Sequence, residues 1–431
     1  MRKVVLVVGA VMFFVALCSG ALIYGMVQMV RGETPVTRGA RLQTKLIKQL
    51  VEPPMKRKHP VPEDLYQRVE YDGPNGKLWG WMSRPPAEQK RSPAIVWIVG
   101  GFPPGGLPDD AWLEADPRND QSGAQYMRAG VITLYPTTRG MEGNPGPQES
   151  FLGEVADVVS AVKWLREQPF VDPERLYVGG HSTGGTLSLL VGASTEVAGV
   201  VSYGPVDNVC GYGQTVLSFD AKSDEECSVR SPATYSMRFP PAVILEGEWA
   251  NSDAVRALGR WPSKGASYVV IPTCDHFQYI GVMNEFFAEK IVKREALTFT
   301  VEQAKKVLEA KFPPTVVESE GWSVTLTSDF AEDEPNANGD RLFRNALSTM
   351  VVSLEEQDPV SCEAEGAIKG RGKECFERAT KTVDGDDWVY FTAQRGNSLF
   401  VTAIGRKDEE KYVIAELNRV LDSAQALPPE H

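Results

Sequence analysis

The chain has 431 residues, which is too long for one ordinary domain and suits two domains with additional segments. Hydrophobic residues make up 42% of the chain, a fraction that excludes a globally disordered protein. The formal net charge is -12, whereas a nucleic-acid binder usually carries net positive charge, so we expect no nucleic-acid partner.

The N-terminus begins with an almost wholly apolar run over residues 4–30, with no charged residue between Lys3 and Arg31. The run is longer than the core of a signal peptide and long enough for a tilted membrane-spanning helix. We therefore predict that residues 1–30 are a transmembrane anchor, which would make the membrane a partner. A signal segment cleaved after Ala21 and a buried helix are the alternatives.

The spacing of the six cysteines gives a hint about the cellular compartment of the protein. Four of them form two local pairs, Cys210 with Cys227 and Cys362 with Cys375. Such pairs suit disulfides in an oxidising compartment, and four unpaired thiols are the alternative. Because basic residues flank both ends of the apolar run, the charge pattern leaves its orientation open. The cysteines favour a folded domain outside the cytoplasm, in the periplasm or at the cell surface.

Residues 31–65 are predicted to be a juxtamembrane connector. Apolar residues between positions 42 and 51 recur at helical spacing, with basic residues among them, which predicts a short amphipathic helix. This helix would either pack on its own protein or lie on an anionic membrane surface.

Residues 66–298 alternate between strand-like and helical patterns and are predicted to form one domain. Continuous Val/Ile runs separated by helices indicate a mostly parallel sheet with helices on both faces, an α/β class of fold. A helix is expected over 151–167. The expected strands are 68–71, 78–81, 94–99, 130–135, 175–178, 197–203, 242–245 and 267–271.

Ser182 is the strongest candidate for a functional residue. It lies in Gly180-x-Ser182-x-Gly184, directly after a predicted strand and before a predicted helix. This is the pattern of a nucleophile elbow, in which flanking glycines permit a sharp turn that exposes the serine hydroxyl. The pattern predicts that Ser182 is a catalytic nucleophile.

A serine nucleophile needs a base, and the chain has only four histidines. His276 follows the predicted strand 267–271, whereas His59 lies in the connector, His431 ends the chain and His181 is part of the elbow. Loops at the carboxyl ends of parallel strands line one crevice, so Ser182 and His276 are expected to meet there. We predict that His276 is the general base.

Residues 66–290 resemble the α/β-hydrolase superfamily, in its prolyl-oligopeptidase and dienelactone-hydrolase-like branch. The resemblance rests on the elbow, on Asp275-His276-Phe277, and on the segments 96–102, 139–146 and 164–176. It implies an oxyanion hole made by the backbone N–H of Thr183 and a second N–H from Gly101 or Phe102.

The resemblance also implies an acidic partner for His276, about three residues after Gly247, where this chain has Ala250. Asp253 is the nearest aspartate and the first candidate, although it could instead cap a helix. Glu248 is the second candidate, Asp207 is the third, and a site with no acid is the remaining alternative.

The C-terminal part begins with a predicted linking helix within residues 299–319. Residues 320–427 are predicted to form a smaller α+β domain, with a hairpin of 388–393 and 398–404 and a final helix over 409–424. This domain faintly resembles the PsbP-like sandwich, and a protein partner could bind through it. No metal-ligand spacing or phosphate loop is found there, so we expect no cofactor and no metal.

Together these features predict a membrane-anchored serine hydrolase that cleaves a carboxylic ester or amide of a small molecule or peptide. The alternatives are a non-catalytic envelope scaffold on a hydrolase fold and an acyltransferase that uses the same residues.

Overall fold

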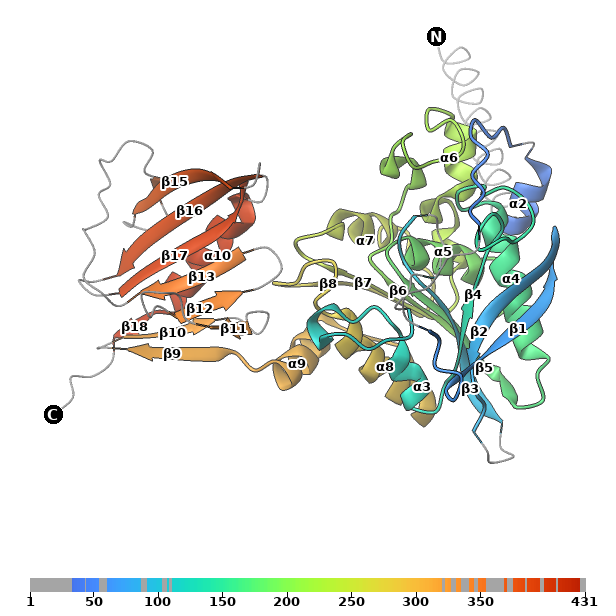
Figure 1. Cartoon of the computed structure of the whole chain (residues 1–431), viewed down its shortest axis with the longest axis horizontal. Coiled ribbons are helices and arrows are strands. Elements are labelled where there is room, and N and C mark those ends of the chain that lie inside the picture. Colours follow the sequence, from blue (N-terminus) through green and yellow to red (C-terminus); the bar gives the residue numbers. More distant parts are fainter. Residues whose placement is uncertain are drawn as a thin grey trace, which may run out of the picture.

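The computed structural model describes residues 33–42, 44–53, 60–86, 91–102, 107, 111–319, 322–326, 331–334, 341–344, 348–353, 368–369, 375–383, 386–395, 399–407 and 410–426. The larger domain and the smaller C-terminal domain lie side by side, and α9 leads from one to the other (Figure 1).

The larger domain is built on an eight-stranded sheet in the order β1-β2-β4-β3-β5-β6-β7-β8. β1 pairs antiparallel with β2, and β2 with β4, while every other pairing is parallel. This confirms the mostly parallel sheet and all eight predicted strands. Their bounds are β1 Tyr66–Gly73, β2 Gly76–Ser83, β3 Ser92–Ile98, β4 Ile132–Pro136, β5 Val171–His181, β6 Gly199–Tyr203, β7 Ala242–Gly247 and β8 Ala266–Ile271.

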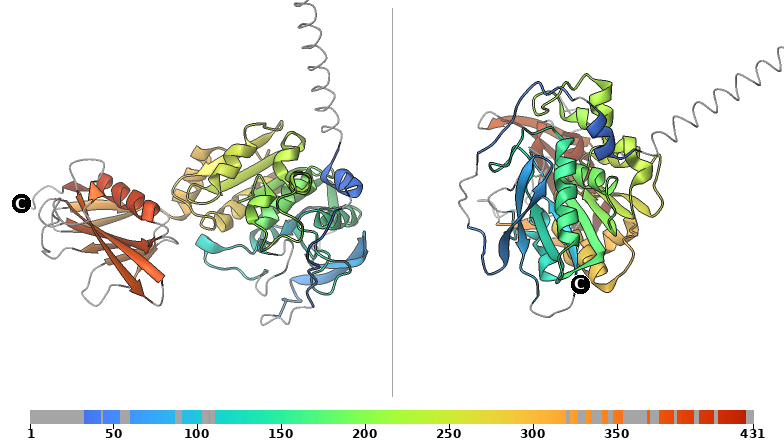
Figure 2. Two further views of the ribbon diagram at one scale, coloured as in Figure 1. Left: turned by 90° about the horizontal axis from the view of Figure 1, so that it is seen from above. Right: turned by 90° about the vertical axis from the view of Figure 1, so that its right-hand side faces the viewer.

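Helices cover both faces of this sheet, as predicted, and each face has its own apolar core (Figure 2). Along β3 the side chains alternate between the two cores, with Val96 facing one and Trp97 the other. One face is covered by α4 (Gly153–Arg166), α5 (Thr183–Gly192) and α7 (Ser252–Leu258). The other face is covered by α3 (Ala124–Arg128), α8 (Ile280–Lys293) and α9 (Val301–Lys311).

Short elements fill the connections near the ends of the strands. They are η1 (Pro117–Asn119), η2 (Val209–Tyr212), α6 (Asp224–Arg230) and η3 (Pro232–Arg238). The disulfide predicted between Cys210 and Cys227 joins η2 to α6, with its Cα atoms 5.6 Å apart. Cys362, of the other predicted pair, lies outside the described residues.

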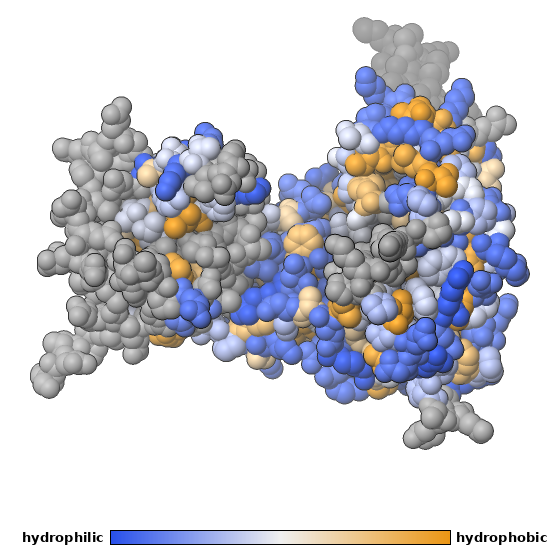
Figure 3. Space-filling model, in the orientation of Figure 1, coloured by the Kyte–Doolittle hydropathy of each residue, from blue (hydrophilic) through white to orange (hydrophobic). Residues whose placement is uncertain are grey.

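The connector folds onto the larger domain, but the predicted amphipathic helix over 42–51 is wrong. The helix of this segment is α2 (Pro35–Arg41), which ends at Leu42. The chain beyond it is extended because its backbone finds partners elsewhere: Ile47 N–H donates to Ser218 O (2.8 Å) and Glu52 N–H to Gly140 O (2.7 Å). Figure 3 shows hydrophobic surface in the upper part of this domain, where α2 and α6 lie in Figure 1.

The C-terminal domain contains two antiparallel sheets, and α10 (Glu410–Ser423) packs its Leu417 and Val420 into the core of this domain. The predicted linking helix, hairpin and final helix are confirmed as α9, β16–β17 and α10. The strands are β9 Thr315–Ser319, β10 Trp322–Leu326, β11 Ala331–Asp333, β12 Arg341–Arg344, β13 Ser348–Ser353, β14 Ile368–Lys369, β15 Cys375–Val383, β16 Asp386–Arg395, β17 Leu399–Arg406 and β18 Gln425–Ala426.

None of the helices in the described part of the chain is both long and apolar enough to cross a membrane. The predicted anchor, residues 1–30, lies outside the described residues, so the anchor stays a prediction.

Candidate active site

Ser182 occupies the sharp turn between β5 and α5. Its backbone has φ 58° and ψ -119°, a strained combination for a residue with a side chain. The turn is fixed because Ser182 N–H donates to Tyr203 O (2.8 Å) and Thr186 N–H donates to Ser182 O (3.0 Å). This geometry is that of a nucleophile elbow, as the sequence predicts.

Gly184 explains why the elbow needs glycine after the serine. A Cβ atom at this position would lie 2.1 Å from the carbonyl oxygen of Ile98, at the end of β3. The close approach lets the first turn of α5 pack against β3, and the helix N-terminus then lies at Ser182.

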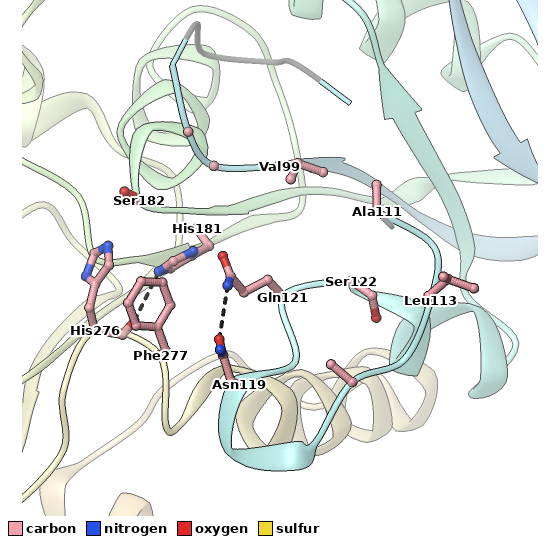
Figure 4. A pocket seen from close by; sticks show the side chains of 13 residues that line it. Val99, Ala111, Leu113, Asn119, Gln121, Ser122, His181, Ser182, His276 and Phe277 are labelled. Atoms are coloured by element: carbon pink, nitrogen blue, oxygen red, sulfur yellow. Dashed lines mark hydrogen bonds between the residues drawn. The ribbon is translucent and has the colours of Figure 1, made fainter. Parts of the chain in front are cut away.

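His276 and Glu246 form a hydrogen-bonded pair at the site. The Nδ1 atom of His276 lies 2.9 Å from Oε2 of Glu246, whose side chain is completely buried. Because a carboxylate can only accept at this contact, Nδ1 carries the proton and Nε2 is left for the substrate side. The imidazole of His276 and the hydroxyl of Ser182 line the same pocket (Figure 4).

Glu246 is the last but one residue of β7, and its carboxylate is surrounded by hydrogen-bond donors. Its Oε1 accepts from the N–H of Gly247 (2.7 Å) and from the hydroxyl of Tyr279 (3.1 Å). Burial raises the pKa of Tyr279 well above its ordinary value, so the phenol remains a donor. A buried carboxylate needs such partners, and here three donors hold it in place.

Gly204 leaves room for this pair at the end of β6. It has φ +59°, and a Cβ atom there would lie 2.3 Å from Cε1 of His276 and 3.1 Å from Oε2 of Glu246. A side chain at position 204 would therefore push the imidazole away from the carboxylate.

The predicted acid, Asp253, is wrong. Its side chain is 98% exposed and pairs with Arg256 (2.9 Å) on the surface of α7. Glu248 accepts from Thr273 N–H (3.2 Å), and Asp207 follows β6. None of the three is the partner of His276, because Glu246 already occupies Nδ1. The sequence did carry a signal for Glu246, since it is an ionisable residue inside an otherwise apolar buried strand.

Neighbouring side chains hold the loop that carries His276. Nε2 of His181 lies 3.0 Å from His276 O, and because a carbonyl only accepts, Nε2 is the protonated nitrogen. Burial lowers the pKa of His181 well below its ordinary value, and the charge of His276 lowers it further, so His181 is neutral at pH 7. On the other side, Asp275 Oδ1 accepts from the N–H groups of Phe277 (2.7 Å) and Gln278 (2.8 Å).

The predicted oxyanion-hole residues Thr183, Gly101 and Phe102 lie together near Ser182. Thr183 begins α5, so its N–H has no partner within the helix. Its hydroxyl donates to Gly101 O and thereby ties the loop after β3 to the elbow. Gly101 lines the same pocket as Ser182. Their role in holding an oxyanion stays a prediction, now with a geometry that suits it.

A pocket of about 390 Å³ opens beside Ser182 and His276 (Figure 4). This volume suits a small molecule or one or two residues of a peptide. Its described lining consists of Val99, Gly100, Gly101, Ala111, Leu113, Ala115, Asn119, Gln121, Ser122, His181, Ser182, His276 and Phe277.

An aromatic cluster flanks the oxyanion loop. The ring of Phe102 contacts Tyr212 edge to face at 4.8 Å, and Tyr212 stacks on Phe151 at 5.7 Å. Tyr212 lies two residues after Cys210 in η2, so the disulfide anchors the segment that places this ring. The hydroxyl of Tyr212 also contacts Thr186 Oγ1 (3.2 Å) in α5.

Behind this cluster lies a group of buried charges at the start of α4. Arg139 makes two bonds to Asp157 (2.9 Å each) and one to Glu149 (2.6 Å). Glu154 Oε1 accepts from the N–H groups of Glu149 (2.6 Å) and Ser150 (3.1 Å). Burial raises the pKa of Glu154 to about 7, although the nearby charge of Arg139 works against this shift.

Ser182, His276 and Glu246 lie together at the carboxyl edge of the eight-stranded sheet, with Ser182 on a nucleophile elbow. This is the arrangement of an α/β-hydrolase. Residues 121–240 match the prolyl oligopeptidase family, Peptidase S9. A curated relative, the uncharacterized peptidase YtmA of Bacillus subtilis, is 29% identical over 145 residues. That alignment covers 29% of this chain and 54% of YtmA, about half of the relative's length. The predicted resemblance to this family is confirmed over residues 121–240.

Solved structures similar to this chain include a hyperthermophilic esterase of the archaeon Pyrobaculum calidifontis. It is 18% identical with a TM-score of 0.41, and the match covers 55% of this chain and 87% of the esterase. The acylaminoacyl peptidase of Pyrococcus horikoshii is 15% identical with a TM-score of 0.43, covering 56% of this chain and 44% of that protein. Likenesses this distant carry no conclusion about the substrate.

Proposed function

We propose that the protein cleaves a carboxylic ester or amide through an acyl-enzyme on Ser182. The observation that carries the proposal is the contact between His276 Nδ1 and the buried Glu246 carboxylate, next to a serine on a nucleophile elbow. This contact leaves Nε2 of His276 as the base on the side of the pocket.

In the first step, His276 Nε2 takes the proton of Ser182 as its oxygen attacks the substrate carbonyl. Glu246 stabilises the imidazolium that forms, and the N–H of Thr183, with that of Gly101 or Phe102, holds the oxyanion. The intermediate collapses, and the imidazolium gives its proton to the departing alcohol or amine. Water then attacks the acyl-enzyme as His276 takes its proton. The ester bond to Ser182 breaks, the proton returns from His276 to the Ser182 oxygen, and the acid is released.

The non-catalytic scaffold is not favoured. That hypothesis rested on Ala250, which stands where the resemblance placed an acid. Glu246 supplies the carboxylate from a different position, so Ala250 no longer argues against catalysis. Acyl transfer to an acceptor other than water would use the same residues.

A fluorophosphonate probe tests the nucleophile directly, because it labels activated serines. Ser182→Ala should abolish labelling of the full chain. Ser194→Ala, just after α5, should leave labelling unchanged. Equal labelling of Ser182→Ala and wild type would show that the nucleophile is another residue. A wild-type chain that stays unlabelled beside a labelled control hydrolase would reject the enzymatic proposal.

We further propose that residues 4–30 anchor the protein in a membrane, with the catalytic domain outside the cytoplasm. The apolar run supports the anchor, and the Cys210–Cys227 disulfide supports an oxidising compartment. After cell breakage, the full chain should remain in membranes washed with alkaline carbonate, and a variant without residues 1–30 should be released. Recovery of the full chain in the wash would contradict the anchor.

A further inference from the structure

Two side-chain amides form one wall of the pocket beside Ser182. Nε2 of Gln121 donates to Oδ1 of Asn119 at 3.0 Å, and both residues line the pocket. Figure 4 shows the carboxamide of Gln121 between Asn119 and the side of the pocket where His181 and Ser182 lie.

The segment that carries this pair is held by buried hydrogen bonds. Asp120 is buried, and its two oxygens accept from Ser122 N–H (2.9 Å) and from the side chain of Gln125 (2.6 Å). The carbonyl of Gln121 accepts from the indole of Trp97 (3.3 Å). These bonds fix the backbone that carries the amide pair, and the exposed Gln121–Asn119 bond holds the two side chains together at the pocket.

The pair keeps both acceptor and donor groups to offer. Each side-chain amide can donate two hydrogen bonds and accept two, and their mutual bond uses one N–H of Gln121 and one lone pair of the Asn119 oxygen. Oε1 of Gln121 and Nδ2 of Asn119 have no partner among the described residues. Turning both amides over would exchange their roles and again leave one oxygen and one NH₂ group.

The rest of the described lining is largely apolar and carries no fixed charge. Val99, Ala111, Leu113, Ala115 and Phe277 are apolar, and the ionisable side chains among the described lining residues are the two histidines. His181 is buried and neutral. A substrate group with a net charge would lose water here without gaining a counter-charge.

We propose that Gln121 and Asn119 bind a secondary amide of the substrate, close to the bond that Ser182 attacks. A secondary amide has one N–H and one C=O, which match the acceptor and the donor of the pair. The substrate class is thus neutral esters or amides that carry a further amide group. This inference rests on the proposed function and adds the specificity of the same site.

Matched esters test the inference on the full chain. The first series consists of p-nitrophenyl esters. The ester of N-acetylglycine carries the amide, and the ester of pentanoate is its alkyl counterpart with the same chain length. The esters of glycine and succinate carry a free ammonium and a free carboxylate. The second series has acetate esters of N-acetylethanolamine and of an alkyl alcohol of equal length. In at least one series kcat/KM should be about tenfold higher for the amide than for its alkyl counterpart. In the first series the two charged esters should be the poorest substrates.

Variants at position 121 separate binding of the amide from catalysis. Gln121→Leu should remove the preference for the amide by lowering kcat/KM for the amide ester more than for the alkyl ester, and probe labelling of Ser182 shows that the variant folds. Gln121→Glu should improve the ammonium ester relative to pentanoate, because it supplies a counter-charge. Gln67→Leu, on β1 and outside the pocket lining, is the control and should keep the wild-type preference.

The inference is overturned if wild type shows no amide preference in either series, or if Gln121→Leu keeps the preference. It is also overturned if Gln121→Leu loses alkyl and amide hydrolysis equally. In these cases hydrolysis of the alkyl ester by wild type, together with probe labelling of Ser182, would leave the proposed function standing. A wild-type chain that hydrolyses no ester and takes up no probe would overturn both.

Discussion

The imidazole of His276 contacts the carboxylate of Glu246 at 2.9 Å, across the ends of two neighbouring strands, β7 and β8. Glu246→Gln should lower kcat on a p-nitrophenyl ester by about 10⁴-fold, because an amide does not hold the required tautomer or stabilise the imidazolium. KM should change little. Circular dichroism should confirm that the variant folds.

Two conservative variants are matched controls for this prediction. Asp253→Asn and Glu248→Gln each remove a carboxylate near the end of β7 and should keep kcat within about twofold, as expected for surface changes. A large loss of kcat in Asp253→Asn, with an active Glu246→Gln, would contradict the assignment of Glu246.

The hydroxyl of Thr183 should matter for catalysis through its bond to Gly101 O. Thr183→Val removes this bond while keeping the shape of the side chain, so the loop with the second oxyanion donor loses a support. One hydrogen bond of about 0.5–1.5 kcal/mol corresponds to a fall in kcat/KM of roughly twofold to tenfold. Thr183→Ser restores the hydroxyl and should recover the rate. Equal losses in the two variants would mean that the hydroxyl is unimportant.

Removal of the Cys210–Cys227 disulfide should lower both stability and activity. The bond closes a loop with a sequence separation of 17 residues, and closure of a loop of this size stabilises a protein by about 3 kcal/mol. The double variant Cys210→Ser, Cys227→Ser should unfold at lower urea concentration and have a lower kcat, since Tyr212 loses its anchor beside Phe102. Wild type with reductant should behave like the variant, whereas the variant should not respond to reductant.

Glu154 should make stability depend on pH. Its pKa is about 7 in the folded chain, against 4.5 when unperturbed, so between these values the folded state binds more protons than the unfolded state. The free energy of unfolding therefore falls as pH rises through this window, by about 3 kcal/mol in total. Glu154→Gln cannot ionise, and urea titrations at several pH values should show a smaller fall. Parallel profiles for variant and wild type would contradict the shift.

Much of the site could be predicted from local patterns. The sharp turn at Ser182 needs neighbouring residues without side chains, and this requirement involves only a few consecutive positions. The elbow could therefore be predicted from the glycines in the sequence. His276 could be found because the order of strands brings the loops after β5 and β8 to one edge. Both predictions needed only sequence spacing and the rule for parallel sheets.

Glu246 and the connector could not be predicted in the same way. The role of Glu246 depends on its burial beside His276 and Tyr279, which come from segments about thirty residues further along the chain. The extended path of residues 44–53 depends on backbone partners at Gly140 and Ser218, which outweigh an apolar spacing that favours a helix. In both cases the deciding contacts are distant in sequence.

The position of Glu246 within β7 has a consequence for the loop that follows the strand. Backbone pairing of Glu246 with Val270 in β8 fixes the backbone of Glu246 through the sheet itself, so the turn beyond Gly247 does not have to position the partner of His276. That turn contacts the neighbouring domain: Arg419 of α10 lies 3.6 Å from Glu248 and over the ring of Trp249. Because the acid lies within the strand, the adjacent turn can contact the C-terminal domain without carrying a residue of the candidate active site.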